Sequence, residues 1–194
     1  MRQLKRNCAS ASSGEQMEFA YELKIPKARI PMLVGKRGTV KRLIEQRTKA
    51  KLQIDSSQGD VRISSDDGLH VYVAREVVTA VGRGFHPDTA LKLTDMESSF
   101  IVLPLPESGK KKYLLRIKGR LIGSEGKTRH IIEEMTETHI SVYGKTVAII
   151  GQQEHALAAR KAVEMLLEGS PHAHVYRFLE KKRRELRRNT TLWQ

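Results

Sequence analysis

Gly35-Lys36-Arg37-Gly38 and Gly123-Ser124-Glu125-Gly126 are two glycine-bounded stretches with the same spacing, and they decide the fold. The second begins 88 residues after the first (123 − 35), and the neighbouring residues keep that offset. Ile44-Glu45 corresponds to Ile132-Glu133, and Thr48 corresponds to Thr136. A repeat of this length is a whole domain and not one unit of a solenoid. We therefore expect two copies of one fold, each with a glycine loop between two helices.

Hydrophobic periodicity around the first loop predicts the order of elements β-α-loop-α-β-β-α. Residues 19–25 alternate between apolar and polar, which is strand period, and Pro26 ends the strand. A short helix over 28–34 accepts Pro31 in its first turn, and Thr39 is expected to cap the next helix. Strands follow at 52–54 and 61–63. A helix opened by 66–67 then presents an apolar face through Leu69, Val73, Val77 and Val81.

The second copy repeats this order, so the fold class is α+β with two tandem domains and a basic C-terminal helix. Its expected elements are strand 100–105, an insertion at 107–112, helices 113–122 and 127–137, strands 140–142 and 147–149, and helix 152–167. A further helix over 175–188 carries seven cations. The predicted organisation is a flexible arm (1–16), a first domain (17–84), a linking helix (85–96), a second domain (97–170) and the basic helix (171–194).

Composition favours a polyanionic partner. The chain has a formal net charge of +13 and an isoelectric point of about 10, which favours nucleic acid over a membrane. Cys8 is the only cysteine, so no internal disulfide or cysteine zinc site is expected, which fits a reducing compartment. No apolar run approaches membrane-spanning length. We expect an intracellular, cytoplasmic protein with no membrane partner.

The glycine loops predict binding of a phosphate backbone. A Gly-x-x-Gly turn leaves backbone N–H groups uncovered at a helix start, and the missing Cβ atoms let phosphates approach closely. A loop of this kind is the backbone clamp of KH domains, which hold about four single-stranded nucleotides. The candidate RNA-binding residues are Gly35, Lys36, Arg37, Gly38 and Lys41 in the first copy, and Lys118, Gly119, Arg120, Gly123, Ser124, Glu125, Gly126, Lys127 and Arg129 in the second.

The sequence also resembles a known family. Ile25-Pro26 followed by residues 34–38 resembles the type I KH motif, with its apolar-proline pair and Ile-Gly-x-x-Gly core. Residues 126–133 read Gly-x-Thr-Arg-x-x-Ile-Glu and resemble the archaeal branch of the small-subunit assembly factors called partner of Nob, or Dim-two type. The resemblance covers about residues 17–170. It implies binding of single-stranded RNA near the 3′ end of small-subunit ribosomal RNA, and contacts with the processing endonuclease.

The two copies are not equal. Pro31 stands where many KH motifs place glycine, whereas the second copy keeps Gly119, which lets a base enter the groove. Glu125 repels phosphate, but the cations around it outweigh one carboxylate. We favour the second copy as the principal RNA site. Four apolar residues are expected either to line its groove or to belong to the core: Leu121, Ile122, Ile131 and Ile140.

Other functions are weaker alternatives. A protein–protein adaptor is the rival class, in which the KH surfaces dock a nuclease or a translation initiation factor and RNA is secondary; Pro31 supports it. No set of catalytic residues converges, and no cofactor or metal is indicated, so we expect no enzymatic activity. His172-x-His174 is interpreted as a solvated helix start. The basic helix is a solvated face, an RNA phosphate contact or a docking element.

Overall fold

A computed structural model of the chain describes residues 19–106 and 111–191. The chain packs as two compact units, the first ending at Gly82 and the second beginning at Arg83. The predicted arm (1–16) and residues 107–110 of the predicted insertion lie outside the described residues. The domain boundaries placed after residues 84, 96 and 170 stay predictions.

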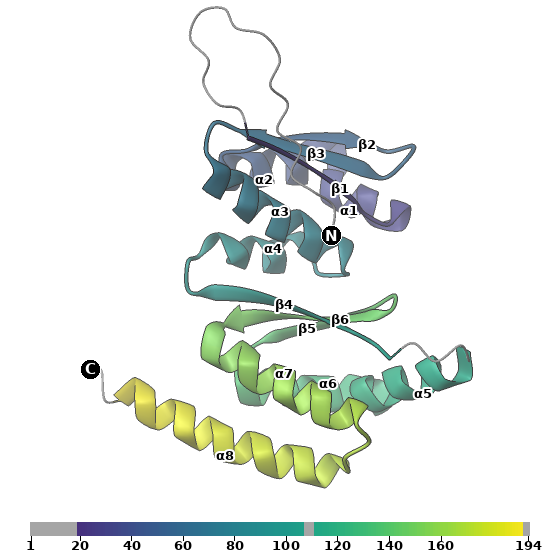
Figure 1. Cartoon of the computed structure of the whole chain (residues 1–194), viewed down its shortest axis with the longest axis vertical. Helices are drawn as coiled ribbons and strands as arrows, with labels where there is room; N and C mark the ends of the chain where they lie inside the picture. Colours follow the sequence, from purple (N-terminus) through teal and green to yellow (C-terminus); the bar gives the residue numbers. More distant parts are fainter. Residues whose placement is uncertain (1–18, 107–110, 192–194) are drawn as a thin grey trace, which may run out of the picture. The chain divides into compact units, whose positions relative to one another are not determined.

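Unit 1 follows the predicted β-α-α-β-β-α order. Its three strands form an antiparallel sheet in the order β1-β3-β2. Helices α1, α2 and α3 lie on one face of that sheet (Figure 1). The elements are β1 (Phe19–Lys24), η1 (Lys27–Arg29), α1 (Ile30–Val34), η2 (Lys36–Gly38), α2 (Thr39–Thr48), β2 (Lys51–Asp55), β3 (Asp60–Ser65) and α3 (Gly68–Gly82).

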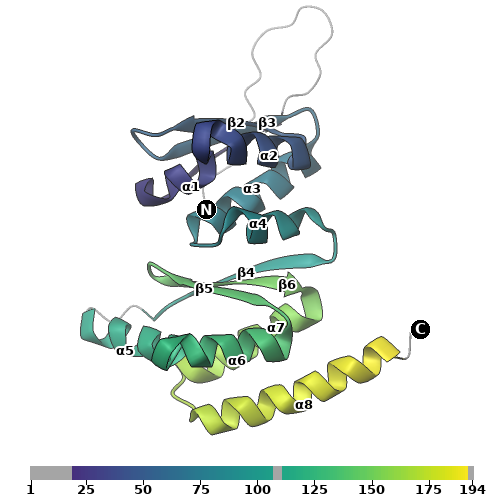
Figure 2. The same cartoon turned by 180° about the vertical axis from the view of Figure 1, so that it is seen from behind.

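Unit 2 repeats the order and adds segments before and after it. Its sheet has the order β4-β6-β5, again antiparallel. Helices α5, α6 and α7 lie on one face of this sheet, and α8 lies on the side of those helices away from it (Figures 1 and 2). The elements are α4 (Pro87–Ala90), η3 (Leu91–Thr94), β4 (Ser98–Pro104), α5 (Lys111–Ile122), η4 (Ser124–Gly126), α6 (Lys127–Thr136), β5 (His139–Tyr143), β6 (Thr146–Gln152), α7 (Gln153–Leu167) and α8 (His172–Thr191).

The residues that repeat between the copies have matching structural roles. Ile44 and Ile132 are almost fully buried. One turn later, the Thr48 hydroxyl donates to the Ile44 carbonyl at 2.8 Å, and Thr136 repeats this bond to Ile132 at 2.7 Å. The glutamates that follow the two isoleucines each accept a hydrogen bond from the first residues of the next strand, from Leu52 N at 2.8 Å and Ile140 N at 2.7 Å. The repeat therefore fixes how the second helix of each copy joins the sheet.

Helix α8 is built into unit 2. Val175 and Leu179 are fully buried and belong to the same core as Leu121, Ile132 and Ile140. The spacing of four residues places both on one face of the helix, which packs on α6 and α7. The predicted basic helix is thus also an apolar element of the second unit.

Three details of the predicted elements are wrong. Thr39 does not cap α2; Gly38 does, with φ 77°, and no side chain bonds to the helix start. Leu69 is exposed, because at about 100° per residue it lies on the side of α3 away from the buried residues Val71, Ala74, Val78 and Val81. Helix α5 begins at Lys111, two residues before the predicted start at 113.

Candidate nucleic-acid interface

The two glycine loops have the same backbone conformation. The first glycines have φ/ψ of 71°/178° at Gly35 and 74°/176° at Gly123. Arg37 and Glu125, at the third positions, have φ of 51° and 54°. The last glycines, Gly38 and Gly126, have φ of 77° and 81°. The two four-residue stretches have only their glycines in common. The backbone conformation of the loop is therefore determined by the glycines and the flanking helices, and not by the two middle side chains.

The first glycine of each loop is required by close packing. A Cβ at Gly35 would lie 2.4 Å from Val40 Cγ2, and one at Gly123 would lie 2.4 Å from Thr128 Oγ1 and 2.8 Å from the Thr128 backbone N. No side chain fits there, since real Cβ contacts are not this short. Each loop therefore packs tightly against the first turn of the helix that follows it, so the loop stays at the N-terminal end of that helix.

The second glycine of each loop meets different surroundings. Nothing lies within 4 Å of a Cβ placed at Gly38. At Gly126 the nearest atoms belong to the His130 ring at 3.5 Å, an ordinary contact, and Gly126 itself is buried. The middle residues of both loops, Lys36-Arg37 and Ser124-Glu125, are exposed. A ligand backbone can therefore reach both turns from outside.

Of the candidate cations in and beside the first loop, two are fully exposed and one forms an ion pair. Lys36 and Arg37 project into solvent. Lys41 is partly exposed, and its Nζ lies 3.8 Å from Glu45 Oε1, an ion pair whose net stabilisation is small. A ligand phosphate can compete for such a weakly held ammonium.

The second loop keeps fewer exposed cations than its sequence suggests. Lys127 is exposed, whereas Arg129 Nε lies 3.6 Å from Glu133 Oε2. Arg120 donates from Nη2 to the Ser170 carbonyl at 2.7 Å, and its buried Nε has no acceptor among the described residues. Lys118 is half-buried and Glu125 is exposed.

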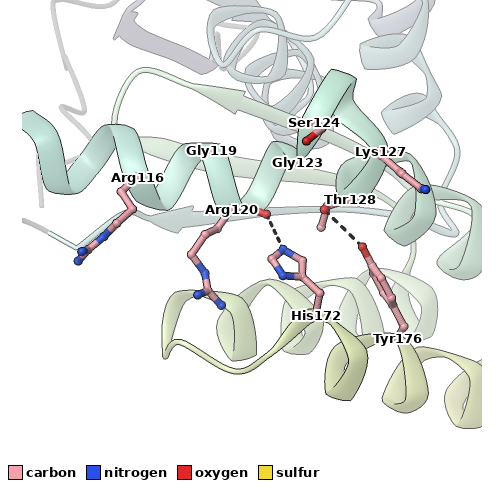
Figure 3. Close-up of a pocket in the computed structure, with 9 residues that line it drawn as sticks. All are labelled: Arg116, Gly119, Arg120, Gly123, Ser124, Lys127, Thr128, His172 and Tyr176. Carbon is pink, nitrogen blue, oxygen red and sulfur yellow. Dashed lines mark hydrogen bonds between the residues drawn. The ribbon is translucent and has the colours of Figure 1, made fainter.

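A hollow of about 460 Å³ adjoins the second loop (Figure 3). It brings together five of the predicted site residues: Gly119, Arg120, Gly123, Ser124 and Lys127. Four further lining residues were not predicted: Arg116, Thr128, His172 and Tyr176. The spacing of three to Gly119 and four to Arg120 places Arg116 on the same helix face, so the sequence held that signal. The sequence near His172 and Tyr176 does not show that they line the hollow, because this depends on how α8 packs on α5 and α6.

Two interpretations of individual residues change with the structure. Leu121 and Ile140 are 3% and 5% exposed and belong to the core, so their groove role is wrong, while Ile122 and Ile131 are half-buried at the surface. His172 is not a solvated helix start: it is partly buried, and its Nε2 lies 3.1 Å from the Arg120 carbonyl oxygen. Since a carbonyl only accepts, Nε2 carries the proton in this contact.

Other site types find no support in residues 19–106 and 111–191. In that part of the chain no three His, Cys, Asp or Glu side chains are grouped to hold a metal ion. None of the helices described there has the length and apolar character needed to cross a bilayer.

Comparisons with known proteins match both units. The family model described as KH domain matches residues 20–80, and one described as eukaryotic type KH domain, type I, matches residues 99–184. The second match extends into α8. These matches agree with the predicted tandem type I KH architecture.

Individual relatives cover most of the chain. A KH domain-containing protein of Methanocaldococcus jannaschii is 45% identical over 89% of this chain and 78% of its own length. The crystal structure of an a/eIF2alpha–aDim2p–rRNA complex from Pyrococcus horikoshii matches at 44% identity with a TM-score of 0.81, over 87% of this chain and 96% of that one.

A more distant relative is the pre-rRNA-processing protein pno1 of Aspergillus oryzae, 30% identical over 69% of this chain. The chain spans about half of that relative's length, 54%. Taken with the repeated loop geometry and the closer matches, these similarities show that the chain belongs to the tandem KH-domain family of the archaeal Dim2p proteins.

Proposed function

We propose that this protein is a single-stranded RNA-binding factor of small-ribosomal-subunit maturation that acts near the 3′ end of the ribosomal RNA. The observation that carries the proposal is the pair of Gly-x-x-Gly turns with matching dihedral angles. A net charge of +13 supports a polyanionic ligand. The relative in complex with rRNA and the relative named as a pre-rRNA-processing protein support ribosomal RNA as that ligand.

In this proposal the strand's phosphates lie along the glycine loops. The turns before α2 and α6 lie at helix starts, where the positive end of the helix dipole attracts phosphate oxygens. The N–H groups of Gly38 and Gly126 already donate to the carbonyls of Gly35 and Gly123 at 3.3 Å, so the attraction does not depend on them. The bases then lie beside the two helices that flank the loop, where Ile122 on α5 and Ile131 on α6 offer half-buried apolar surface in the second copy. Phosphate contacts supply affinity, and hydrogen bonds to base edges supply sequence preference.

Unit 2 is proposed as the principal RNA site. Gly119 is exposed and has no atom within 4 Å of its Cβ position, so a base or ribose can lie directly on α5. Pro31 holds the equivalent place on α1 and is also exposed, but its ring fills that space. Glu125 weakens the second loop electrostatically without blocking it.

The proposed role is non-catalytic. The protein holds a strand in place for another factor, and its proposed protein partners are the rRNA processing endonuclease and a translation initiation factor. The second of these is supported by the a/eIF2alpha named in the related complex. The proposed location is the cytoplasm.

A second candidate is a protein adaptor role for unit 1. Pro31 favours it, because the ring closes the place where a base would enter while Lys36 and Arg37 stay exposed for acidic protein surfaces. In this alternative RNA binding is confined to unit 2 or is secondary.

The test is a titration with a single-stranded 3′-terminal fragment of small-subunit ribosomal RNA. A scrambled strand of equal length and the duplex form of the same fragment serve as controls. The proposal expects tight binding of the authentic strand, weaker binding of the scrambled strand, and little binding of the duplex. Equal affinity for all three RNAs would show that binding depends only on net charge, and this result would favour the adaptor role.

A further inference from the structure

The hollow beside the second loop is bounded by three separate segments of unit 2. Arg116, Gly119 and Arg120 come from α5, the loop and first turn of α6 supply Gly123, Ser124, Lys127 and Thr128, and α8 supplies His172 and Tyr176 (Figure 3). Its lining holds three cations and an imidazole but no carboxylate. Such a lining is suited to an anion.

The same hollow has features that suit a nucleotide better than a bare phosphate. Two glycines lie in its wall, and Gly119 leaves open space above α5. The rings of His172 and Tyr176 form an aromatic side, with centroids 6.2 Å apart and planes tilted by 54°. Bases stack on aromatic side chains of this kind. The hollow has a volume of about 460 Å³ and is wide open to solvent, as a surface that a strand crosses would be.

The aromatic side is held in place by hydrogen bonds to α5 and α6. The Tyr176 hydroxyl donates to Thr128 Oγ1 at 3.3 Å, and His172 Nε2 bonds to the Arg120 carbonyl. Arg120 in turn bonds the Ser170 carbonyl ahead of α8, yet its buried Nε has no acceptor among the described residues. The aromatic side of the hollow is therefore formed before any ligand arrives.

Unit 1 lacks every charge of this hollow. With the offset of 88, Arg116, Arg120 and Lys127 correspond to Ala28, Met32 and Thr39. Unit 1 also ends at Gly82 with α3, so it has no counterpart of α8. The glycine loop is common to both copies, whereas this cationic, aromatic hollow belongs to the second copy alone.

We propose that the hollow is an additional nucleotide subsite, in which α8 extends the RNA path of the second KH domain beyond its glycine loop. Gly123 and Ser124 belong both to the loop and to the hollow, so one strand can pass from one to the other without a break. Arg116 and Lys127, which are both exposed, bind the phosphate, and the base lies against Tyr176. The inference rests on the proposed RNA binding and adds the recognition of one further nucleotide.

The experiment measures affinity for single-stranded RNAs of four and of seven nucleotides that share the preferred sequence. Two variants test the subsite: Arg116→Gln, at an exposed position, and Tyr176→Leu, which keeps apolar packing but removes the ring. Lys161→Gln, an exposed position on α7 outside the hollow, is the charge-matched control. We expect each variant to bind the seven-nucleotide RNA about tenfold more weakly. The four-nucleotide RNA is held by the loop and should change less than about twofold, as should both RNAs with the control.

Three other outcomes would contradict either the subsite or the proposed RNA binding. If both variants lose equal affinity for short and long RNA, or lose none, the subsite is wrong while RNA binding stands. If the unmodified protein binds no RNA of either length, the proposed function itself fails. If AMP alone saturates the hollow at micromolar concentration, as followed by Tyr176 ring signals in NMR, the ligand is a free nucleotide and the extended RNA path is overturned.

Discussion

Gly123 combines a left-handed backbone with a site that admits no side chain. Gly123→Ala would bring a Cβ to 2.8 Å from the Thr128 backbone N, which cannot swing away. We expect the free energy of unfolding to fall by about 1–3 kcal/mol or more. Gly144→Ala is the matched control, because Gly144 has φ 57° but nothing within 4 Å, so only backbone strain remains. Urea unfolding measures both; equal losses would show that the packing of the loop on α6 is unimportant.

Gly119 is expected to separate stability from binding. It lies inside α5 without positive φ and without close neighbours, so Gly119→Ala should stabilise the fold by about 0.5–1 kcal/mol. The same methyl group occupies the space proposed for the RNA, so the dissociation constant for single-stranded RNA should rise. Thermal unfolding and an RNA titration on the same sample check the two effects. A more stable protein with unchanged RNA affinity would remove Gly119 from the interface.

His139 gives unit 2 a pH dependence. Burial and the Lys92 ammonium, whose Nζ lies 2.8 Å from Nε2, hold the pKa of His139 below its ordinary value of 6.5, against the opposing charge of Glu133. The unfolded chain therefore takes up this proton at higher pH than the folded one. The contribution of neutral His139 is fully present above pH 6.5 and is lost as pH falls through the lowered pKa.

The corresponding measurement is the free energy of unfolding between about pH 7.5 and 5. We expect it to decline on acidification in the unmodified protein and to decline less in His139→Gln. Carboxyl groups with a lowered pKa, such as that of Asp66, titrate below this range and therefore do not contribute to the slope within it. An identical slope in both proteins would contradict the assignment.

At the scale of elements, α8 has a buried and a charged face. Its buried face makes truncation after Gly169 a poor test of RNA binding, since that change also removes Val175 and Leu179 from the core. Leu179→Ala alone should cost about 2–5 kcal/mol of stability. Calorimetry or urea unfolding checks this, and Ala173→Ser, at an exposed position of the same helix, is the control. A loss below about 0.5 kcal/mol would mean that α8 is only loosely attached.

The charged face of α8 is tested without disturbing the core. Four exposed cations repeat at helical spacing along it: Arg177, Lys181, Arg184 and Arg188. If they touch phosphates, replacing all four by Gln should flatten the plot of log affinity against log salt by about three units, at roughly 0.7 per contact with a single strand. An unchanged slope would leave the face solvated or engaged with another protein.

The elements were predictable where local chemistry decides them. The structure confirms three such predictions: the strand that alternates through Tyr21 and Leu23, its end before Pro26, and the turns formed by the paired glycines. Packing decided the rest. Thr39 is the first residue of α2 and not its N-cap, because the chain turns one residue earlier, at Gly38, which has a positive φ. Leu69 is outside the core because it lies on the opposite side of α3 from Val71 and Val78. The hollow depends on α8, which approaches α5 from about fifty residues away in sequence.

At the scale of the whole molecule, the chain carries one scaffold twice with different chemistry on each copy. Unit 1 has the more basic loop, Lys36-Arg37, and unit 2 has the open Gly119, the cationic hollow and the additional helix. The glycines, the isoleucine-glutamate pair and the helix-end threonines are shared because folding needs them. The residues proposed to face a ligand differ between the copies. We therefore infer a division of labour between the copies, with unit 2 as the principal RNA site.

The measurement that tests this claim most directly compares Gly126→Asp with Gly38→Asp in a titration with the single-stranded ribosomal fragment. Both positions have similar φ, 81° and 77°, so backbone strain is matched, but a side chain at Gly126 would contact the His130 ring while one at Gly38 would meet open space. Gly126→Asn and Gly38→Asn repeat the side chain without its charge, since Asn tolerates the left-handed region. We predict that Gly126→Asp weakens binding at least about tenfold and Gly38→Asp less than about threefold, with smaller effects for the Asn variants. The opposite order, with Gly38→Asp the more damaging of the two, would contradict the account.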